Sequence, residues 1–207
     1  GRNLLAVIFV RIVCLDLEGV LIPEIWVAFA SFTGVAELTR TTRDEPDYSK
    51  LMQYRLDILN KNGFTLKQIQ DVIEKLEPLP GALQFLQEIR RNFEVILLSD
   101  TFKEFAGPLI KKLNYPTLFC HELEVEDGKI ISERLRLPDH KRKTVQYLQK
   151  LNFEVIAAGD SYNDLGMLKT ANFCMLFNPP DQLVIEYPDI SVAREYNTLL
   201  SFLKNPR

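Results

Sequence analysis

Cysteine, histidine and tryptophan are scarce in this chain of 207 residues, which holds three, two and one of them respectively. The cysteines Cys14, Cys120 and Cys174 lie far apart, each in or beside an apolar run. Such an odd and widely spaced set argues against a disulfide framework, and its spacing fits no zinc motif. We therefore expect reduced thiols in core-like surroundings and a cytoplasmic location for the protein.

A large excess of charge of one sign is also missing. The chain has 25 basic and 28 acidic residues and a net charge of -3, so we expect no nucleic-acid partner, because such a protein normally has a basic surface. The apolar run at residues 4–15 is broken by Arg11 and is too short to span a bilayer, and no signal-peptide cleavage site is evident. We expect no membrane partner, and we expect residues 1–10 to be an additional strand or vector-derived sequence.

What the chain does have is a recurring pattern of short apolar runs that end at an acidic residue. These runs occupy residues 13–16, 96–100 and 156–160, and two further short runs lie at residues 173–177 and 190–192. Helical patterns separate them at residues 81–92, 103–113, 141–151 and 164–171. Buried strands that alternate with helices predict an α/β fold with a doubly wound, Rossmann-like parallel sheet.

The long segment between the first two runs has helical patterns at residues 24–33, 48–62 and 65–76. These patterns are bounded by strong helix breakers, namely Pro23, Pro46, Gly63, Pro78 and Pro80. We expect a small helical cap domain at residues 23–81, inserted over the strand ends of a core domain that comprises residues 1–22 and 82–207. Alternating hydrophobicity on both sides of Asp127-Gly128 predicts a β-hairpin at residues 122–136.

The first run ends at Asp16, which is followed by Glu18 and Gly19. A strand that ends in an acid and then turns on a glycine presents a carboxylate at the rim of the sheet, where open α/β sheets bind their ligands. Because the two acids are two residues apart, a nucleophile and a proton-transfer group can share one loop. Taken alone, the segment is also compatible with a plain strand end that has no chemical role.

Asp160 and Asp164 follow the third run at an expected strand-to-helix turn. Carboxylates that converge on Asp16 would repel one another unless a cation neutralised them, and a set of oxygen ligands suits Mg²⁺. The alternative interpretation of this segment alone is a helix N-terminus, where capping and the helix dipole favour acidic residues.

Ser99 lies at the end of the second run, where a hydroxyl and the backbone N–H groups of the following turn can hold a phosphate oxygen. A cap for the helix that begins near Phe102 is the alternative role. A lysine near the start of the following helix would offset the charge of a phosphate. Lys141 and Lys143 are both candidates, although a lysine at the surface is more often simply solvated.

The order of these elements resembles the haloacid dehalogenase superfamily of aspartyl-phosphate phosphohydrolases, over nearly the whole chain after residue 10. The first motif, Asp-x-Asp-x-Thr/Val, matches residues 16–20, and the second matches Ser99. The third-motif lysine matches Lys141 best, since Val145 and Leu148 then have the usual downstream spacing, and Lys143 is the second choice. The fourth motif matches residues 159–164.

The resemblance implies a role for each matched residue. Asp16 would attack phosphorus to form an aspartyl phosphate, and Glu18 would donate a proton to the leaving oxygen and then activate water. Mg²⁺ would be held by Asp16, Asp160 and the main-chain carbonyl of Glu18, with Asp164 in support. The phosphate side of the substrate would contact Ser99, Asp100, Lys141 and Asn163.

Glu18 departs from the family pattern, which has Asp at this position. The segments Asp-Leu-Glu-Gly-Val, Pro-Glu-Ile-Trp, Thr-Thr-Arg-Asp and Leu-Ser-Asp-Thr-Phe closely resemble one branch of the family, the bacterial bifunctional phosphoserine phosphatase/homoserine phosphotransferases. In that branch Glu is the expected residue, so the departure indicates the branch rather than a defect in the motif.

The expected cap contains two further candidates. At helical spacing, Arg55 falls in the middle of an apolar face formed by Leu51, Met52, Leu56 and Leu59, and a buried arginine needs an anionic partner. That partner is either an acid of the protein or, as in phosphoserine phosphatases, the carboxylate of the substrate. By the same resemblance Glu24 would bind the substrate ammonium, although an acid in a first helical turn is often merely favoured by the dipole.

We therefore expect a Mg²⁺-dependent phosphomonoesterase that hydrolyses L-phosphoserine, with homoserine as a further phosphoryl acceptor. A phosphatase for a nucleotide or for pyridoxal phosphate is the alternative within enzymes, and the pair of Arg55 and Glu24 argues against it. A phospho-acceptor signalling domain is the alternative from another class, but it would have no helical cap. His121 and His140 show no constellation in the sequence, and we expect them to be structural or solvated.

Overall fold

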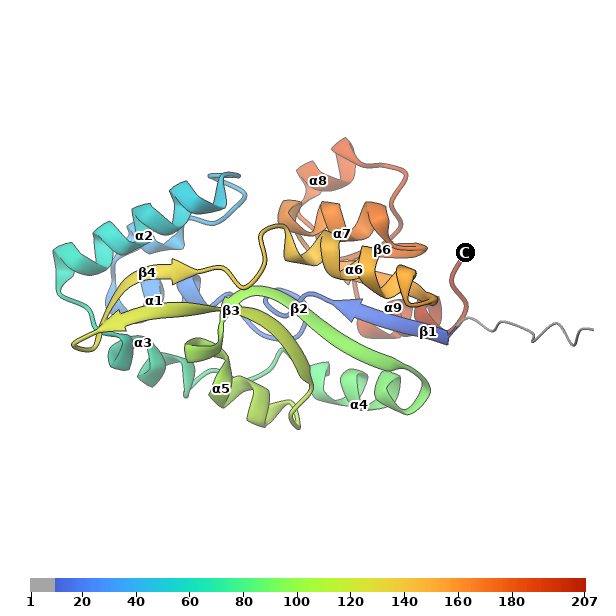
Figure 1. Cartoon of the computed structure of the whole chain (residues 1–207), viewed down its shortest axis with the longest axis horizontal. Coiled ribbons are helices and arrows are strands. Elements are labelled where there is room, and N and C mark those ends of the chain that lie inside the picture. Colours follow the sequence, from blue (N-terminus) through green and yellow to red (C-terminus); the bar gives the residue numbers. More distant parts are fainter. Residues whose placement is uncertain (1–9) are drawn as a thin grey trace, which may run out of the picture.

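The computed structural model describes residues 10–207, which form a seven-stranded sheet with helices on both faces (Figure 1). Along the sheet the strands follow the order β4-β3-β2-β1-β5-β6-β7, and every neighbouring pair is parallel except β3–β4. Their bounds are β1 Val10–Leu15, β2 Glu94–Phe102, β3 Thr117–Glu126, β4 Lys129–Arg134, β5 Phe153–Gly159, β6 Phe173–Phe177 and β7 Val192–Ala193. The predicted doubly wound α/β fold is confirmed.

The two faces of the sheet bury separate hydrophobic clusters. Val13 and Leu15 of β1 belong to one cluster and Ile12 and Cys14 to the other, as the alternation of side chains along a strand requires. The first cluster is covered by α4 (Ala82–Asn92), α5 (Lys103–Lys112) and α9 (Tyr196–Lys204). The second is covered by α6 (His140–Lys150), α7 (Leu165–Thr170) and α8 (Asp181–Glu186). The last four residues of β1 are therefore buried on both faces of the sheet, up to the point where the strand ends.

Further helices lie beyond the carboxyl end of β1, on the left of Figure 1. They are α1 (Ile25–Thr33), the 3₁₀ helix η1 (Ala36–Thr39), α2 (Tyr48–Asn62) and α3 (Leu66–Ile73). The β3–β4 hairpin extends to the same side, where the backbone N–H of Leu66 donates to the carbonyl of Gly128 in the hairpin turn. The limits of the cap domain at residues 23 and 81 stay a prediction. In the structure the β3–β4 hairpin lies beside these helices, which the sequence did not predict.

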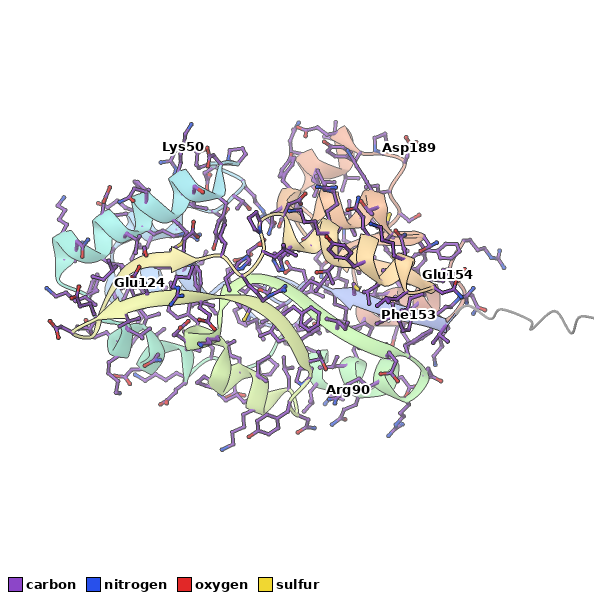
Figure 2. All side chains as sticks on the ribbon, in the orientation of Figure 1. Lys50, Arg90, Glu124, Phe153, Glu154 and Asp189 are labelled. Atoms are coloured by element: carbon purple, nitrogen blue, oxygen red, sulfur yellow. The ribbon has the colours of Figure 1, made fainter. Side chains whose placement is uncertain are left out.

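Local signals in the sequence explain where these helices begin and end. The Asp47 side chain accepts a hydrogen bond from the backbone N–H of Lys50 at the start of α2, and Gly63 ends the helix with a φ of +68°. Thr65 and Gln68 form a reciprocal capping box at the start of α3. The polar face of α2 points away from the molecule, as the labelled Lys50 shows in Figure 2.

Several predicted bounds differ from the structure. β3 begins at Thr117 rather than at residue 122, because its first residues pair in parallel with β2 before the strand enters the hairpin. The strand expected at residues 190–192 lies at Val192–Ala193. Two helices, α8 and α9, were not predicted.

The expectation for residues 1–10, an additional strand or vector-derived sequence, lies outside the described residues except for Val10, which begins β1. Among residues 10–207, no helix combines the length and the apolar character that crossing a membrane would require.

Candidate active site

The site lies where β1, β2 and β5 come together at the carboxyl edge of the sheet. Leu15 of β1 is paired with Leu97 of β2 and with Ala158 of β5, so the residues that follow these positions converge. Asp16, Ser99 and Asp160 are all buried there. The three apolar runs thus bring together residues that are far apart in the chain.

The turn after β1 is held by its own backbone. The N–H of Gly19 donates to the carbonyl of Ile22, and the N–H of Leu21 donates to the carbonyl of Leu17. Gly19 has a φ of +80°, and a Cβ atom there would lie 2.2 Å from Asp160 Oδ2. Only glycine fits between the two acidic loops, because any side chain would displace that carboxylate.

Asp16, Asp160 and Asp164 offer carboxylate oxygens that lie within 4.8 Å of one another, and all three residues are buried. Asp160 Oδ1 is buried and has no hydrogen-bond partner. Asp164 has little capacity left, because Oδ2 accepts from the N–H groups of Asp160 and Ser161 and Oδ1 accepts from Lys141. Clustered acids with an unpaired buried oxygen fit a hard divalent cation, for which Asp16 and Asp160 are the available side-chain ligands.

The electrostatics of the cluster lead to the same conclusion. Burial, followed by the neighbouring charge of Asp164, raises the pKa of Asp16 well above its usual value. The same causes raise the pKa of Asp160 to about 7. A bound cation would lower the pKa values of these carboxyl groups, because its positive charge favours their ionised forms.

Lys141 occupies the centre of these acids. Its Nζ atom donates to Asp164 Oδ1 at 2.7 Å and to Asp16 Oδ1 at 3.0 Å. Burial alone would lower the pKa of Lys141, but Asp100, Asp16 and Asp164 together hold it well above the usual value. The structure places Lys141 in the cluster, whereas Lys143, the second candidate, is half-buried and outside it.

Glu18 connects the turn after β1 to helix α1. Its Oε1 atom accepts a hydrogen bond of 2.8 Å from the backbone N–H of Ile25 at the start of α1. The longer side chain of Glu, compared with Asp, provides the reach for this contact. Burial, followed by the charge of Glu24, raises the pKa of Glu18 to about 8, so the group is protonated near neutral pH and can donate a proton.

Ser99 lies within the irregular stretch of β2 between Leu98 and Phe102, rather than at the end of the strand. Its Oγ atom accepts a hydrogen bond of 3.1 Å from the N–H of Thr101. The alternative role as a helix cap is wrong, because α5 begins at Lys103 and its cap residue Phe102 provides no side-chain hydrogen bond.

Arg55 points inward from α2, as its position on the apolar face predicts, and it is 5% exposed. Its guanidinium group lies 4.8 Å from the centre of the Trp26 ring and donates from Nη2 to the carbonyl of Arg40 at 3.1 Å. Its Nε atom is buried without a hydrogen-bond partner. Among the described residues no carboxylate forms an ion pair with Arg55, so the alternative of a structural ion pair is not observed.

Glu24 is the N-cap residue of α1 and is half-buried. Its pKa is raised by burial, against the opposing effect of Arg55 and Arg43. Glu24 and Arg55 line one pocket, whose other polar walls include Asp16, Glu18, Ser99, Asp100 and Asn163. The pocket therefore combines Glu24 and Arg55 of the inserted helices with Asp16 of the acidic cluster.

Some residues of this site were missed by the sequence analysis. His121 and His140 are buried and lie against Asp100, so the expectation that no constellation surrounds them is wrong. They come from β3 and α6, and no local pattern in the sequence relates them. Arg43, which approaches Asp160 Oδ2 to 3.7 Å, and Tyr48, whose hydroxyl donates to the carbonyl of Asp100 at 2.9 Å, were also missed.

A parallel sheet that gathers acids, a lysine and a hydroxyl at its carboxyl edge, beneath inserted helices, is the architecture of a hydrolase with a metal-assisted acidic site. Residues 10–172 match the haloacid dehalogenase-like hydrolase family. The chain belongs to this family.

Two similar proteins come from Pseudomonas. Phosphoserine phosphatase ThrH of Pseudomonas aeruginosa is 48% identical over 196 residues, which is 94% of this chain and 96% of that protein. A phosphoserine phosphatase of Pseudomonas syringae is 48% identical over 191 residues, which is 92% of this chain and 81% of that protein. Among solved structures, a substrate-bound phosphoserine phosphatase complex has a TM-score of 0.77 at 21% identity, covers 93% of this chain and 98% of its own, and supports the fold.

Proposed function

We propose that this protein is a Mg²⁺-dependent phosphoserine phosphatase that passes the phosphoryl group through Asp16. The observation that carries the proposal is the position of Arg55 and Glu24 in the same pocket as Asp16. A buried arginine without a carboxylate partner suits the carboxylate of an amino acid, and the neighbouring Glu24 suits its ammonium group. The identity of 48% with two phosphoserine phosphatases agrees with this choice of substrate.

In the proposed reaction a carboxylate oxygen of Asp16 attacks phosphorus, and the bond from phosphorus to the seryl oxygen breaks. Glu18 donates its proton to that oxygen, so serine leaves with a neutral hydroxyl group. Glu18 then accepts a proton from water while the water oxygen attacks the phosphorus of the aspartyl phosphate. Inorganic phosphate leaves, and Asp16 returns to its carboxylate form.

The remaining residues hold the phosphoryl group. Lys141 donates to Asp16, and Ser99, Asp100 and Asn163 line the pocket that contains Asp16. Asp16, Asp160 and the main-chain carbonyl of Glu18 would hold Mg²⁺, with Asp164 in support, and the ion would supply positive charge to the phosphoryl oxygens. Oxygen ligands in a small acidic cluster favour Mg²⁺ over softer metals.

Homoserine is the proposed second acceptor. It differs from serine by one methylene group, so the same Arg55 and Glu24 can hold its carboxylate and ammonium while its hydroxyl takes the place of water. A cytoplasmic location is part of the proposal, and the three free cysteines agree with it.

The test is the rate of phosphate release from L-phosphoserine, a nucleoside monophosphate and pyridoxal phosphate, each with Mg²⁺ and with or without homoserine. We expect the highest kcat/KM for L-phosphoserine and the formation of phosphohomoserine when homoserine is present. A preference for the nucleotide or for pyridoxal phosphate would refute the assigned substrate. A phosphorylated protein that persists for minutes to hours would support the signalling alternative instead.

A further inference from the structure

Asp100 lies between two buried histidines from different elements. Its Oδ1 atom is 3.0 Å from Nε2 of His140, the first residue of α6, and 3.7 Å from Nε2 of His121 in β3. The two imidazole rings lie 4.4 Å apart between centroids, and the residues are 2% and 3% exposed. A carboxylate with two imidazoles can form either a metal site or a cluster of hydrogen bonds, and the ring nitrogens distinguish the two.

The backbone determines which nitrogen of His121 carries a proton. The N–H of Arg136 donates to His121 Nδ1 at 3.1 Å, so this nitrogen holds a lone pair. In the neutral ring the proton is then on Nε2, which faces Asp100. A metal ion at Asp100 would need the lone pair on Nε2 instead. The proton of the neutral ring would then be on Nδ1, where it would clash with the N–H group of Arg136. His121 therefore turns an N–H group toward Asp100, from 3.7 Å, rather than the lone pair that a metal ligand needs.

His140 has the same orientation toward Asp100. Its Nε2 atom faces the carboxylate, while its Nδ1 atom is buried without a hydrogen-bond partner. A neutral ring with the proton on Nε2 leaves no buried N–H group unsatisfied in this arrangement. Burial also lowers the pKa of His140, against the opposing effect of Asp100. His140 thus donates to Asp100 Oδ1, and His121 turns its Nε2 toward the same oxygen at 3.7 Å.

The other oxygen of Asp100 faces the phosphate subsite. Asp100 Oδ2 accepts from Asn163 Nδ2 at 2.7 Å and lies 3.4 Å from Lys141 Nζ. Lys141 in turn donates to Asp16, the residue assigned as the nucleophile. The carboxylate of Asp100 is therefore shared between two histidines on one oxygen and two residues of the subsite on the other.

We propose that His121 and His140 are positioning residues, which orient the Asp100 carboxylate so that it places Lys141 and Asn163 for the phosphoryl group. The inference rests on the phosphatase function proposed above, but it concerns the phosphoryl group alone. It therefore holds for any phosphate ester that the site accepts. The histidines themselves need not touch the substrate.

The test compares two variants at the same position. Gln can place its amide N–H near the position of His Nε2, whereas Leu keeps much of the volume and removes the donor. We expect His140→Leu to weaken the binding of inorganic phosphate about tenfold, measured by calorimetry with Mg²⁺ present, while His140→Gln retains most of the affinity. Val145→Ala, a truncation of a buried residue of the same helix, is the control and should bind phosphate as the wild type does.

Kinetics provide a second readout. His140→Leu should raise KM for phosphoserine and for an aryl phosphate by the same factor, since both carry the phosphoryl group. In an Asp100→Asn background the same substitution should add less than about twofold, because its effect passes through the carboxylate. If His140→Leu does not fold, the pair His121→Leu and His121→Gln carries the same comparison.

Three results would overturn the inference: equal losses in His140→Leu and Val145→Ala, equal losses in the Leu and Gln variants, or Zn²⁺ binding that His121→Gln abolishes. The last result would assign the cluster to a metal. Failure of the proposed substrate has a different signature, because phosphoserine would then be a poor substrate while the pattern of phosphate affinities stayed as expected.

Discussion

Arg55 and Glu24 are the residues proposed to select an amino-acid phosphate as the substrate. Arg55 is buried on the apolar face of α2, and its Nε atom has no hydrogen-bond partner. An unsatisfied buried donor lowers the stability of the protein unless a ligand occupies it. The sequence indicated this residue because one charged side chain interrupts an otherwise apolar helical face.

Replacing Arg55 by Ala should separate two kinds of substrate. We expect kcat/KM for L-phosphoserine to fall about 100-fold, since removal of one member of a buried charge pair costs about 2–5 kcal/mol. An aryl phosphate without a carboxylate should be hydrolysed at nearly the wild-type rate. Lys50→Ala, at an exposed position of the same helix, is the control and should change neither rate. Equal losses on both substrates would contradict the role of Arg55.

The residues of the site differ in how far the sequence predicts them. Asp16, Asp160 and Lys141 each follow a strand or begin a helix, so their convergence follows from the parallel sheet. His121 and His140 meet through the packing of β3 against the start of α6, and neither position has a local signal. The packing of a strand against a helix decides this contact, and one sequence contains no direct record of such packing.

Among the elements of the fold, the turn between β1 and α1 packs directly against the acidic cluster. Gly19 lies against Asp160, and Glu18 accepts from the first N–H of α1. This turn therefore links the loop that contains Asp160 to α1, the first helix of the inserted segment. Its short sequence, Asp-Leu-Glu-Gly-Val, predicted a place in the site only in combination with Ser99, Lys141 and Asp160.

Gly19→Ala should disturb this turn more than its backbone angle alone explains. The added Cβ atom would lie 2.2 Å from Asp160 Oδ2, so the carboxylate must move, and we expect the affinity for Mg²⁺ to fall about tenfold or more. Gly34→Ala is the matched control, since Gly34 also has a positive φ, +72°, but a Cβ atom there would meet nothing within 4 Å. Titration of both variants with Mg²⁺ measures their affinities for the metal, and equal affinities would contradict the role assigned to Gly19.

The sequence predicted the longer elements better than the short ones. The strands that carry Asp16 and Asp160 end where the apolar runs end, and α2 has the predicted bounds at Tyr48–Asn62. In contrast, α8 has six residues and β7 has two, which is too short for a periodic pattern. Tertiary packing stabilises such elements, as in the stacking of Tyr196 at the start of α9 on Phe85 and Phe177.

At the scale of the whole molecule, the acidic cluster lowers the stability of the metal-free protein at high pH. The pKa of Asp160 is raised from 3.8 to about 7 and that of Glu18 from 4.5 to about 8. The folded state therefore holds these protons more tightly than the unfolded state. The stability that the protonated groups provide is complete below their unfolded pKa values and is lost as the pH rises through 7 and 8.

We expect the Tm of the protein in EDTA to fall by several degrees between pH 5 and pH 9, with a smaller fall in Asp160→Asn. Mg²⁺ should raise Tm, and more so at pH 8 than at pH 6, because its ligands must lose their protons to bind it. Thermal unfolding at a series of pH values, with EDTA or Mg²⁺, measures both effects. A Tm that rises with pH in EDTA, or that does not respond to Mg²⁺, would contradict the proposed metal site.

In the proposed reaction Asp16 carries the phosphoryl group of phosphoserine during turnover. The most direct measurement of this step is acid quenching of the enzyme with phosphate-labelled L-phosphoserine, followed by peptide mapping of the label. We predict a label that hydroxylamine removes, as it does from an acyl phosphate, on the peptide that contains Asp16. The label and the turnover should both be absent in Asp16→Asn but present in Asp181→Asn, an exposed control. Turnover by Asp16→Asn, or a label that resists hydroxylamine, would contradict the account.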